Sequence, residues 1–317
     1  MRKIGMAVVG AGFWGRNHAR NLKELSETRL LAVCDKDEAK AKAVADLFGV
    51  DAYTDSSKMM KRQDVEAVTI CTWSTTLATE AMRALRLGKH VLVEKPMANN
   101  IREAQRVIEL AEKRHRYVMV GFLMRFIPGV QRIKQAVEKG EIGSVVYATA
   151  RRVSQWPERI GDVGVVKDLA IHDIDITRYI FNDEPVEVYA KAGSFRHKKF
   201  EDHAQILVTF RGGKTAFIEA NWLTPYKIRK LTVTGSEAIV TLDYTTQEIT
   251  METAGQTLAP RYEVKEPLKL ELQHFANSIM DDKEPMTTGV DGLKALQIAE
   301  AALKSARTGK AIKLKPL

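Results

Sequence analysis

Three polar side chains at helical spacing are the first residues of this sequence that could do chemistry. Asp168, His172 and Asp175 stand at positions i, i+4 and i+7, which a helix would place on one face. A carboxylate one turn away can orient an imidazole and raise its basicity. An imidazole with a pKa near neutral can in turn take the proton of a hydroxyl group. The cluster is therefore a candidate acid–base site.

Two structural alternatives apply to the same cluster. Asp168 could be the N-terminal acid of an amphipathic helix in which His172 is merely packed. The histidine and the carboxylates could also bind a metal ion. No H-x-x-x-H or C-x-x-C set occurs elsewhere in the chain to complete such a site, so we expect no metal.

A lysine with candidate chemistry stands in Glu94-Lys95-Pro96, directly after an apolar run at 91–93. In an open parallel sheet, ligands bind beyond the carboxyl ends of the strands. Pro96 restricts Lys95 to an extended backbone, which would fix the direction of the ammonium group. Lys95 could therefore act on a ligand at the sheet edge, or it could pair with Glu94 at the surface.

A G-x-G-x-x-G motif formed by Gly10, Gly12 and Gly15 lies between an apolar run and a helix-like segment. These glycines permit a sharp turn, a close approach of pyrophosphate to the backbone, and tight packing of helix on strand. Asp35 ends the next apolar run, 20 residues after Gly15, where a carboxylate can accept hydrogen bonds from both ribose hydroxyls of an adenosine. It would also repel a 2′-phosphate, so the motif predicts NAD, while the neighbouring Lys36 keeps NADP as the alternative. A glycine-rich turn that binds no nucleotide is the structural alternative.

The elements that must position these residues divide into two patterns. Through Gly121, buried-type apolar runs alternate with helical segments, which predicts a parallel, doubly wound sheet. After Gly121, strands follow one another, with a hairpin signal at Gly212-Gly213, and the helical segments include 167–181. We expect an α/β protein with a Rossmann domain that binds NAD over 1–121 and an α+β domain for substrate and oligomerisation over 122–317, built on a large, mostly antiparallel open sheet.

Composition narrows the possible partners. The chain has 317 residues and a net charge of +9, but lysine and arginine are spread along it and the longest basic groups, 196–199 and 310–315, are short. This favours a solvated basic surface over nucleic-acid binding, with some attraction for an anionic ligand such as a nucleotide cofactor or nucleotide sugar. No apolar run is long enough for a membrane span and no signal peptide precedes the first strand, so we expect a cytoplasmic protein.

The chain resembles the glucose–fructose oxidoreductase, inositol dehydrogenase and MocA (Gfo/Idh/MocA) family almost from end to end. The motifs that carry the resemblance are the G-x-G-x-x-G, GKHVLVEKP at 88–96, VGFLMRF at 120–126, EKGEIGSV at 138–145, D-x-x-x-H at 168–172, and GVDGLKALQIAEAALKSARTGKAIKL at 289–314. Members of this family use the lysine of E-K-P and the aspartate and histidine of D-x-x-x-H where a sugar or cyclitol is oxidised. The resemblance therefore implies that Lys95, Asp168 and His172 are catalytic.

The resemblance also implies a set of binding residues. The expected cofactor-binding residues are Gly10, Gly12, Phe13, Trp14, Gly15, Asp35, Thr72, Trp73, Glu94 and Lys95, and the expected substrate-binding residues are Lys95, Arg125, Asp168 and His172. The family further implies a homodimer or homotetramer built through the open sheet, a last helix at about 289–307 that packs back on the first domain, and often a cis Lys–Pro bond.

Some positions depart from the family pattern. Where the family often has T-P-N-x-x-H, this chain has Thr72-Trp73-Ser74-Thr75-Thr76-Leu77, and Leu123 stands where asparagine is common. Trp73 could stack near a nicotinamide or pack in the core.

The substrate expectation comes from two local matches, GRNHARNL at 15–22 and GDVGVVKDLAIHDIDITRYIF at 161–181. Both resemble nucleotide-sugar 3-dehydrogenases that act on UDP-N-acetylglucosamine or its uronic acid. We therefore expect NAD-dependent oxidation of a secondary hydroxyl at C3 of a UDP-N-acetyl-hexosamine. The alternatives are an inositol or free-sugar dehydrogenase of the same family, and a non-catalytic NAD-sensing regulator. A sensor needs no proton acceptor, so the retained Lys95, Asp168 and His172 argue against it.

Overall fold

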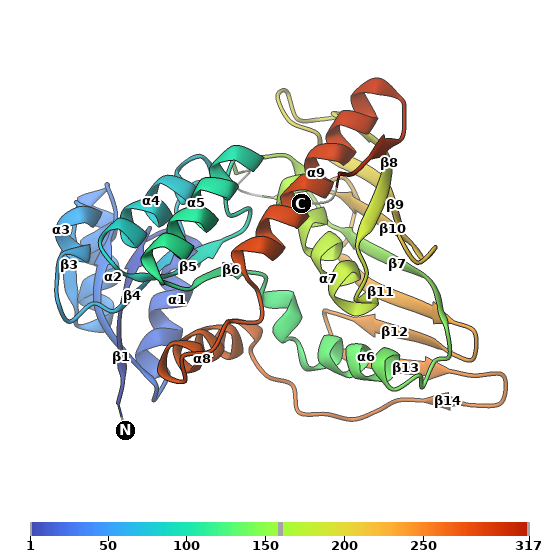
Figure 1. Ribbon diagram of the computed structural model, residues 1–317, viewed down its shortest axis with the longest axis horizontal. Helices are drawn as coiled ribbons and strands as arrows, with labels where there is room; N and C mark the ends of the chain where they lie inside the picture. Colours follow the sequence, from blue (N-terminus) through green and yellow to red (C-terminus); the bar gives the residue numbers. More distant parts are fainter. Residues whose placement is uncertain (1, 158–160, 316–317) are drawn as a thin grey trace. The chain divides into compact units, whose positions relative to one another are not determined.

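The computed structural model describes residues 2–157 and 161–315 (Figure 1). The chain forms two compact units: unit 1 comprises Met1–Leu123 and Glu266–Leu293, and unit 2 comprises Met124–Lys265 and Lys294–Leu317. The first boundary lies close to the Gly121 expected from the sequence. The return of 266–293 to unit 1 departs from the expected division, which placed everything after 121 in the second domain.

Unit 1 is built on a six-stranded sheet in the order β3-β2-β1-β4-β5-β6, with every pair parallel. This order is that of a doubly wound dinucleotide-binding fold, whose strand order reverses between β1 and β4. The strands are β1 Ile4–Val9, β2 Thr28–Cys34, β3 Asp51–Tyr53, β4 Ala67–Ile70, β5 His90–Glu94 and β6 Val118–Gly121. The helices are α1 Phe13–Glu24, α2 Glu38–Phe48, α3 Ser56–Met60, α4 Ser74–Arg86, α5 Ile101–Arg114 and α8 Pro267–Met280. The predicted Rossmann sheet is confirmed.

Local chemistry explains where these elements begin and end. Strands β1, β4 and β6 are buried along their whole length, as parallel strands covered by helices on both faces must be. Helix α2 begins where the Asp37 side chain accepts a hydrogen bond from the Lys40 backbone, and it ends at Gly49 with φ +61°. Glycine adopts that left-handed conformation without a steric penalty.

Helix α8 belongs to unit 1 because its apolar side packs against α1 and β1. Leu272 and Phe275 are fully buried there. Two side chains of α1 reach the start of this helix: Arg20 pairs with Glu266, and the Asn21 amide donates to the same carboxylate at 2.9 Å. A helical apolar stripe shows that a helix must pack, but it does not show which core receives it.

Unit 2 is built on a nine-stranded sheet in the order β14-β13-β12-β11-β7-β10-β9-β8-β15. Among the described strands of this sheet, only β7 and β10 pair in parallel, so the predicted mostly antiparallel sheet is confirmed. The strands are β7 Val145–Val153, β8 Pro185–Gly193, β9 His203–Phe210, β10 Thr215–Asn221, β11 Ile228–Gly235, β12 Ile239–Asp243, β13 Glu248–Glu252, β14 Thr257–Leu258 and β15 Ile312–Lys313.

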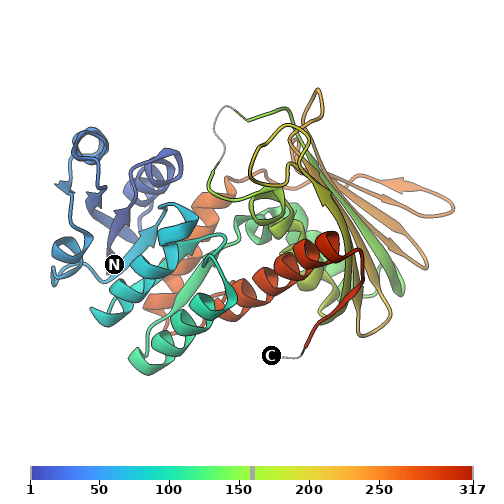
Figure 2. The same cartoon turned by 90° about the horizontal axis from the view of Figure 1, so that it is seen from above.

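Helices cover one face of this sheet (Figure 2). Helix α6 Pro128–Glu138 packs on α7 Ile171–Phe181 and β12, and α7 packs on β7 and β10. Side chains along β9 and β10 alternate between buried and accessible, as expected when only one face meets the core. A short 3₁₀ turn, η1 Leu123–Phe126, precedes α6.

One long helical segment differs from expectation, and a second one spans both units. The helix predicted over 167–181 is a π-helical turn, η2 Val166–Ala170, followed by α7. The last helix, α9 Gly289–Thr308, crosses the boundary between the units, and Gly289–Leu293 belongs to unit 1. The rest lies in unit 2, where Lys294 pairs with Glu184 at 2.6 Å.

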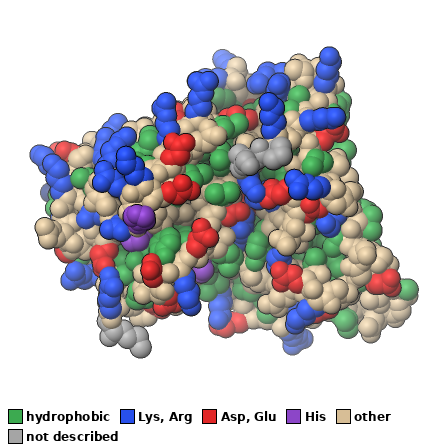
Figure 3. Space-filling model, viewed as in Figure 1, with side chains coloured by type: hydrophobic (Ala, Val, Ile, Leu, Met, Phe, Trp, Pro, Cys, Tyr) green, Lys and Arg blue, Asp and Glu red, His purple; other side chains and the backbone are tan. Residues whose placement is uncertain are grey.

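No helix among the described residues is both long and apolar enough to cross a bilayer. On the face shown in Figure 3, lysine and arginine side chains occur over both units, with acidic side chains among them.

Candidate active site

The glycine loop of unit 1 has the geometry that its sequence predicted. Gly10 turns out of β1 with φ +98°, and its N–H donates to the Cys34 carbonyl at 2.7 Å. A Cβ at Gly10 would lie 2.6 Å from the Cys71 carbonyl oxygen, and a Cβ at Gly15 would lie 1.7 Å from the Gly10 carbonyl oxygen. Any other residue at either position would force the loop apart, so both glycines are required by close packing.

The start of α1 is suited to an anion. The helix begins at Phe13, and its N-cap Gly12 supplies no side-chain cap. The first N–H groups of the helix, with the positive end of its dipole, are therefore directed at whatever lies in front of the loop. Phe13 is 70% exposed and Trp14 is 40% exposed, and their rings meet edge to face at 5.7 Å. Two accessible aromatic side chains thus flank the loop.

Asp35 is joined to this loop at the end of β2. Its Oδ2 accepts from the Ala11 N–H at 2.7 Å, and its Oδ1 accepts from the Asp37 N–H at 3.0 Å. Each carboxylate oxygen keeps a second lone pair, so the group can still accept from ribose hydroxyls. A dinucleotide fits this arrangement. It combines an uncapped helix N-terminus, two glycines where a side chain would clash, and the Asp35 carboxylate.

Thr72 and Trp73 follow β4 on the same edge of the sheet. Thr72 Oγ1 accepts from Thr76 Oγ1 at 2.9 Å, and Trp73 is the N-cap of α4. Trp73 is 48% exposed, which contradicts the alternative in which it packs in the core. Its indole is therefore accessible at the edge where the sheet binds ligands.

Lys95 follows the last residue of β5, Glu94, and the Lys95–Pro96 peptide is cis, as the family resemblance implied. Glu94 is 5% exposed, so its carboxylate is buried and does not lie at the surface. Its Oε1 lies 3.1 Å from Nε2 of His18 on α1, and its Oε2 accepts from the Lys95 N–H at 3.2 Å. A Cβ added to Gly121 would lie 3.1 Å from this carboxyl group, so β6 encloses it from another side.

A second acid lies near this pair and was not predicted from the sequence. Glu271 of α8 is fully buried, and neither of its carboxyl oxygens has a hydrogen-bond partner among the described residues. Burial, and then the charge of Glu94, raise the pKa of Glu271 well above its usual range. Burial therefore favours the neutral form of the Glu271 carboxyl group. Glu271 and Glu94 lie far apart in the sequence, so no local sequence pattern predicts that the two acids are neighbours.

Asp168 and His172 occupy adjoining elements of unit 2. Asp168 lies within the π-helical turn η2, where its N–H donates to the Gly164 carbonyl at 2.9 Å. His172 lies in the first turn of α7 and is 6% exposed. Short π-helical segments inside helices are often found at functional sites. The D-x-x-x-H motif thus lies where the regular helix is interrupted.

Asp175, the third member of the predicted cluster, forms an ion pair with Arg125. Its two carboxylate oxygens accept from Nε and Nη2 of Arg125 at 2.8 and 2.6 Å. Arg125 is 4% exposed, and its guanidinium lies 4.7 Å from the centre of the Tyr179 ring. The Arg125 edge that Asp175 occupies is not available to a substrate.

A second pair of the same type holds α7 to the sheet. Arg152 of β7 donates from Nε and Nη2 to Asp173, both at 2.8 Å, and both side chains are 1% exposed. Buried bidentate pairs of this kind fix orientation because the planar guanidinium matches a carboxylate in one geometry. Together, Asp173 and Asp175 fix the rotation of the helix that carries His172.

Unit 1 therefore carries Lys95 and the expected cofactor-binding residues, and unit 2 carries Arg125, Asp168 and His172. Three or more metal-binding side chains grouped closely enough to hold an ion are not found among the described residues.

Two family models match the chain, in agreement with its two units. Residues 4–122 match the oxidoreductase family with an NAD-binding Rossmann fold, and residues 130–241 match the GFO/IDH/MocA C-terminal domain. An inositol 2-dehydrogenase of Rhizobium meliloti is 30% identical over 95% of this chain and 96% of its own length. A UDP-N-acetylglucosamine 3-dehydrogenase of Acidithiobacillus ferrooxidans is 28% identical over 92% of this chain and 94% of its own.

Solved structures show the same fold over almost the whole chain. A structure of UDP-N-acetylglucosamine 3-dehydrogenase from Acidithiobacillus ferrooxidans matches with a TM-score of 0.91 and 26% identity, covering 97% of this chain and 99% of that one. An oxidoreductase of Agrobacterium radiobacter in complex with NAD⁺, L-tartaric acid and magnesium has the same fold, with a TM-score of 0.91, 22% identity and 98% of each chain covered. The prediction of an NAD(P)-dependent oxidoreductase is confirmed: the chain belongs to the Gfo/Idh/MocA family and carries its NAD-binding Rossmann domain.

Proposed function

We propose that this protein is an NAD-dependent dehydrogenase that oxidises a secondary hydroxyl of a sugar, C3 of a UDP-N-acetyl-hexosamine or its uronic acid. The observation that carries the proposal is the combination of Lys95 beyond β5 of the NAD-binding sheet with the Asp168-x-x-x-His172 motif at the η2–α7 junction. The UDP-N-acetylglucosamine 3-dehydrogenase named above supports the choice of substrate, since it matches nearly the full chain.

Each residue has a distinct role in the proposed reaction. His172 takes the proton of the substrate hydroxyl, and Lys95 donates a hydrogen bond to the same oxygen as negative charge develops on it. Asp168 orients the sugar or His172. NAD, held by the glycine loop and Asp35, would supply the acceptor for the hydride that leaves the carbon. The products are a keto sugar, NADH and a proton held by the protein.

NAD is proposed over NADP because of Asp35. Its carboxylate is held at the glycine loop by the Ala11 and Asp37 N–H groups, and it cannot swing away without losing both hydrogen bonds. A 2′-phosphate on the adenosine ribose would meet this negative charge. The exposed Lys36 next to it is a feature that favours NADP.

An inositol dehydrogenase is the second candidate, because the inositol 2-dehydrogenase of Rhizobium meliloti is as similar to this chain as the nucleotide-sugar enzyme. Incubation with NAD and a panel of UDP-N-acetyl-hexosamines, free hexoses and cyclitols, scored for NADH formation, separates the candidates. The proposal predicts the highest kcat/KM for a UDP-N-acetyl-hexosamine, and a preference for a cyclitol or free hexose would contradict it. Absence of turnover with every compound, despite NAD binding, would favour the sensing regulator.

We also propose that the protein is a cytoplasmic homodimer or homotetramer that associates through the open face of the unit 2 sheet. Tyr189, Leu207 and Phe217 are paired across β8, β9 and β10, and they are 37%, 41% and 43% exposed. A row of exposed apolar side chains on a sheet face is typical of a surface that a partner covers. A second copy is the partner proposed. Leu207→Lys is expected to shift the mass in solution toward the monomer, whereas Val264→Lys, a change at another exposed apolar residue, is expected to leave it unchanged.

A further inference from the structure

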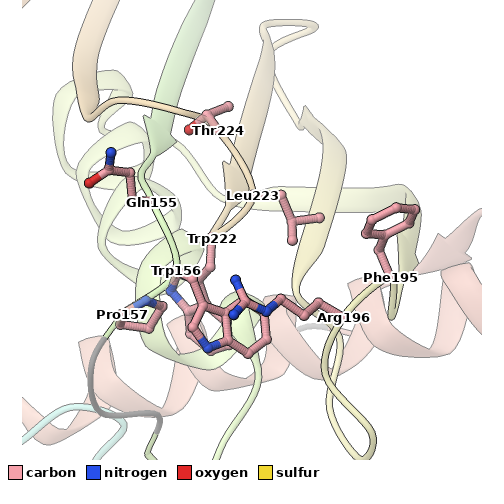
Figure 4. Close-up of a pocket in the computed structure, with 8 residues that line it drawn as sticks. All are labelled: Gln155, Trp156, Pro157, Phe195, Arg196, Trp222, Leu223 and Thr224. Atoms are coloured by element: carbon pink, nitrogen blue, oxygen red, sulfur yellow. The ribbon is translucent and has the colours of Figure 1, made fainter.

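A hollow in unit 2 brings together three separate stretches of the chain (Figure 4). Its volume is about 790 Å³, which lies within the range of roughly 300–1,000 Å³ found for small-molecule sites. The residues that line it are Gln155, Trp156, Pro157, Phe195, Arg196, Trp222, Leu223 and Thr224. None of the proposed catalytic residues is among them, so the hollow lies outside the group of residues to which the chemistry is assigned above.

One wall of the hollow is aromatic and cationic. The rings of Trp156 and Trp222 meet edge to face, with centroids 6.3 Å apart at 80°. The guanidinium of Arg196 lies 4.5 Å from the centre of a Trp156 ring (Figure 4). Trp222 is 3% exposed and packs against Trp156, which is half-buried. Trp156 and Arg196 together offer a flat surface of the kind on which a nucleobase stacks.

The hollow also has a positive rim. Arg196 is the first residue of the basic group 196–199, one of the longest in the sequence, and Lys198 and Lys199 are exposed beside it. None of the 8 lining side chains is acidic. Arginine and lysine in this arrangement attract phosphate groups.

The loop that carries Arg196 is held in shape by a buried acid. Asp202 is fully buried, and its carboxylate accepts from the N–H groups of Phe195 at 2.9 Å, Arg196 at 2.6 Å and His197 at 2.8 Å. Burial alone would raise the pKa of Asp202, but these backbone donors lower it to about 2, so the carboxylate is charged at neutral pH. The Trp222 N–H also donates to the Asp202 carbonyl at 3.0 Å. The loop therefore needs little ordering when a ligand binds.

The same loop is tied to the turn that carries Asp168. The Glu201 carbonyl accepts from the Val165 N–H at 3.0 Å, and its Oε1 accepts from the Val166 N–H at 3.2 Å. Strand β10, which ends just before Trp222, packs against η2. The hollow and the D-x-x-x-H motif thus belong to one hydrogen-bonded framework within unit 2.

We propose that the hollow binds the nucleoside diphosphate part of the substrate, with the nucleobase against the Trp156–Arg196 surface and the diphosphate beside the cations at 196–199. This inference rests on the proposed function, because it assigns recognition of the part of a nucleotide sugar that does not react. A free hexose or cyclitol has no phosphate for these cations and no planar base for the tryptophan. The hollow therefore explains how the enzyme selects nucleotide sugars.

The test measures binding of UDP by isothermal titration calorimetry with NAD present at saturation, so that UDP does not enter the dinucleotide site. Arg196→Gln is expected to raise the Kd of UDP roughly tenfold or more, because it removes a charge-assisted contact to phosphate. Trp156→Leu is expected to raise the Kd of both UDP and uridine roughly fivefold or more, because it removes the stacking surface. Arg211→Gln, which removes an exposed charge elsewhere in unit 2, is the matched control and is expected to leave the Kd unchanged.

Two readouts distinguish failure of this inference from failure of the proposed function. The inference is overturned if UDP does not bind the wild type, or if Arg196→Gln and Trp156→Leu bind it as well as the wild type does. The proposed function fails separately if no UDP-sugar is oxidised while UDP binding still depends on Arg196. If both hold, Arg196→Gln raises the KM for UDP-N-acetylglucosamine by about the same factor as the Kd of UDP, with kcat within about twofold of the wild type.

Discussion

The imidazole of His18 lies 3.1 Å from the carboxylate of Glu94, and both side chains are buried. His18 belongs to the helix that begins at the glycine loop, and Glu94 also accepts from the backbone N–H of Lys95. One carboxylate therefore connects the cofactor helix to the proposed catalytic lysine. The glycine loop and Lys95 are positioned by the same buried contact.

Loss of this contact is expected to affect both stability and catalysis. His18→Ala leaves the Glu94 carboxylate buried without its imidazole partner, which costs about 1–3 kcal/mol in the free energy of unfolding. Because Glu94 also holds the Lys95 backbone, kcat is expected to fall more than NAD affinity does. Urea unfolding, NAD titration and steady-state kinetics measure the three effects.

His115→Asn is the control for this change, since it removes a histidine side chain from the exposed end of α5 and keeps a residue that tolerates the φ of +52° found there. It is expected to leave all three quantities near the wild-type values. Wild-type kcat in folded His18→Ala would show that the contact has no part in positioning Lys95.

Asp35 is expected to set the choice of cofactor. Asp35→Ser removes the charge that would repel a 2′-phosphate, so the ratio of NADP affinity to NAD affinity is expected to rise at least about tenfold. The ratio is obtained by titrating each dinucleotide and following the quenching of tryptophan fluorescence. An unchanged ratio would mean that another group, such as Lys36, determines the preference.

Two neighbouring arginines on β7 allow a matched test of stability. Arg152→Met leaves Asp173 as an uncompensated buried charge, which is expected to cost about 3–5 kcal/mol in the free energy of unfolding. Arg151→Met breaks the more exposed pair with Glu219, where the arginine side chain is 49% exposed, and is expected to cost at most about 1 kcal/mol. Urea denaturation of the two variants measures the difference, and equal losses would contradict the role given to the buried pair.

The pH dependence of stability below neutrality is expected to include a contribution from His90. Burial, and then the charge of Arg116, lower the pKa of His90 from 6.5 to about 4 in the folded protein. Between these two values the unfolded chain takes up a proton that the folded chain does not, so the free energy of unfolding falls as the pH falls from 6.5 toward 4. Above pH 6.5 both states are neutral and the contribution does not change with pH.

The test compares urea unfolding at several pH values in the wild type and in His90→Gln. The variant is expected to show a shallower fall in stability over that window. His115→Asn removes an exposed histidine and is expected to keep the wild-type slope. A slope that is the same in all three proteins would show that His90 titrates alike in the folded and unfolded chains.

The sequence predicted most reliably the features that depend on local spacing. The roles of Gly10 and Gly15 in turning and packing, the doubly wound strand order and the change of pattern after Gly121 follow from neighbouring residues, and the structure confirms them. The place of Asp35 beside the glycine loop also followed from its spacing, because two adjacent parallel strands end on the same edge of a sheet.

Features that depend on partners far apart in the chain could not be read in the same way. Asp175 has the right helical spacing to join Asp168 and His172, but Arg125 occupies its carboxylate. Three other features bring together stretches that are far apart in the chain, and neither stretch alone predicts the contact. They are the packing of α8 in unit 1, the approach of Glu271 to Glu94 and the hollow around Trp156. The π-helical turn at 166–170 was also missed, since helical periodicity does not distinguish it from a regular helix.

The central claim is that Lys95 and His172 carry out proton and charge chemistry on a sugar hydroxyl, and its most direct test is the turnover of UDP-N-acetylglucosamine with NAD by the wild type, Lys95→Ala and His172→Ala. NADH formation is measured in parallel with NAD binding by titration. The account predicts turnover by the wild type, a loss of roughly 10²–10⁴ in kcat for each variant, and NAD affinity within about threefold of the wild type. Near-normal kcat in either variant, with folding and NAD binding intact, would contradict it.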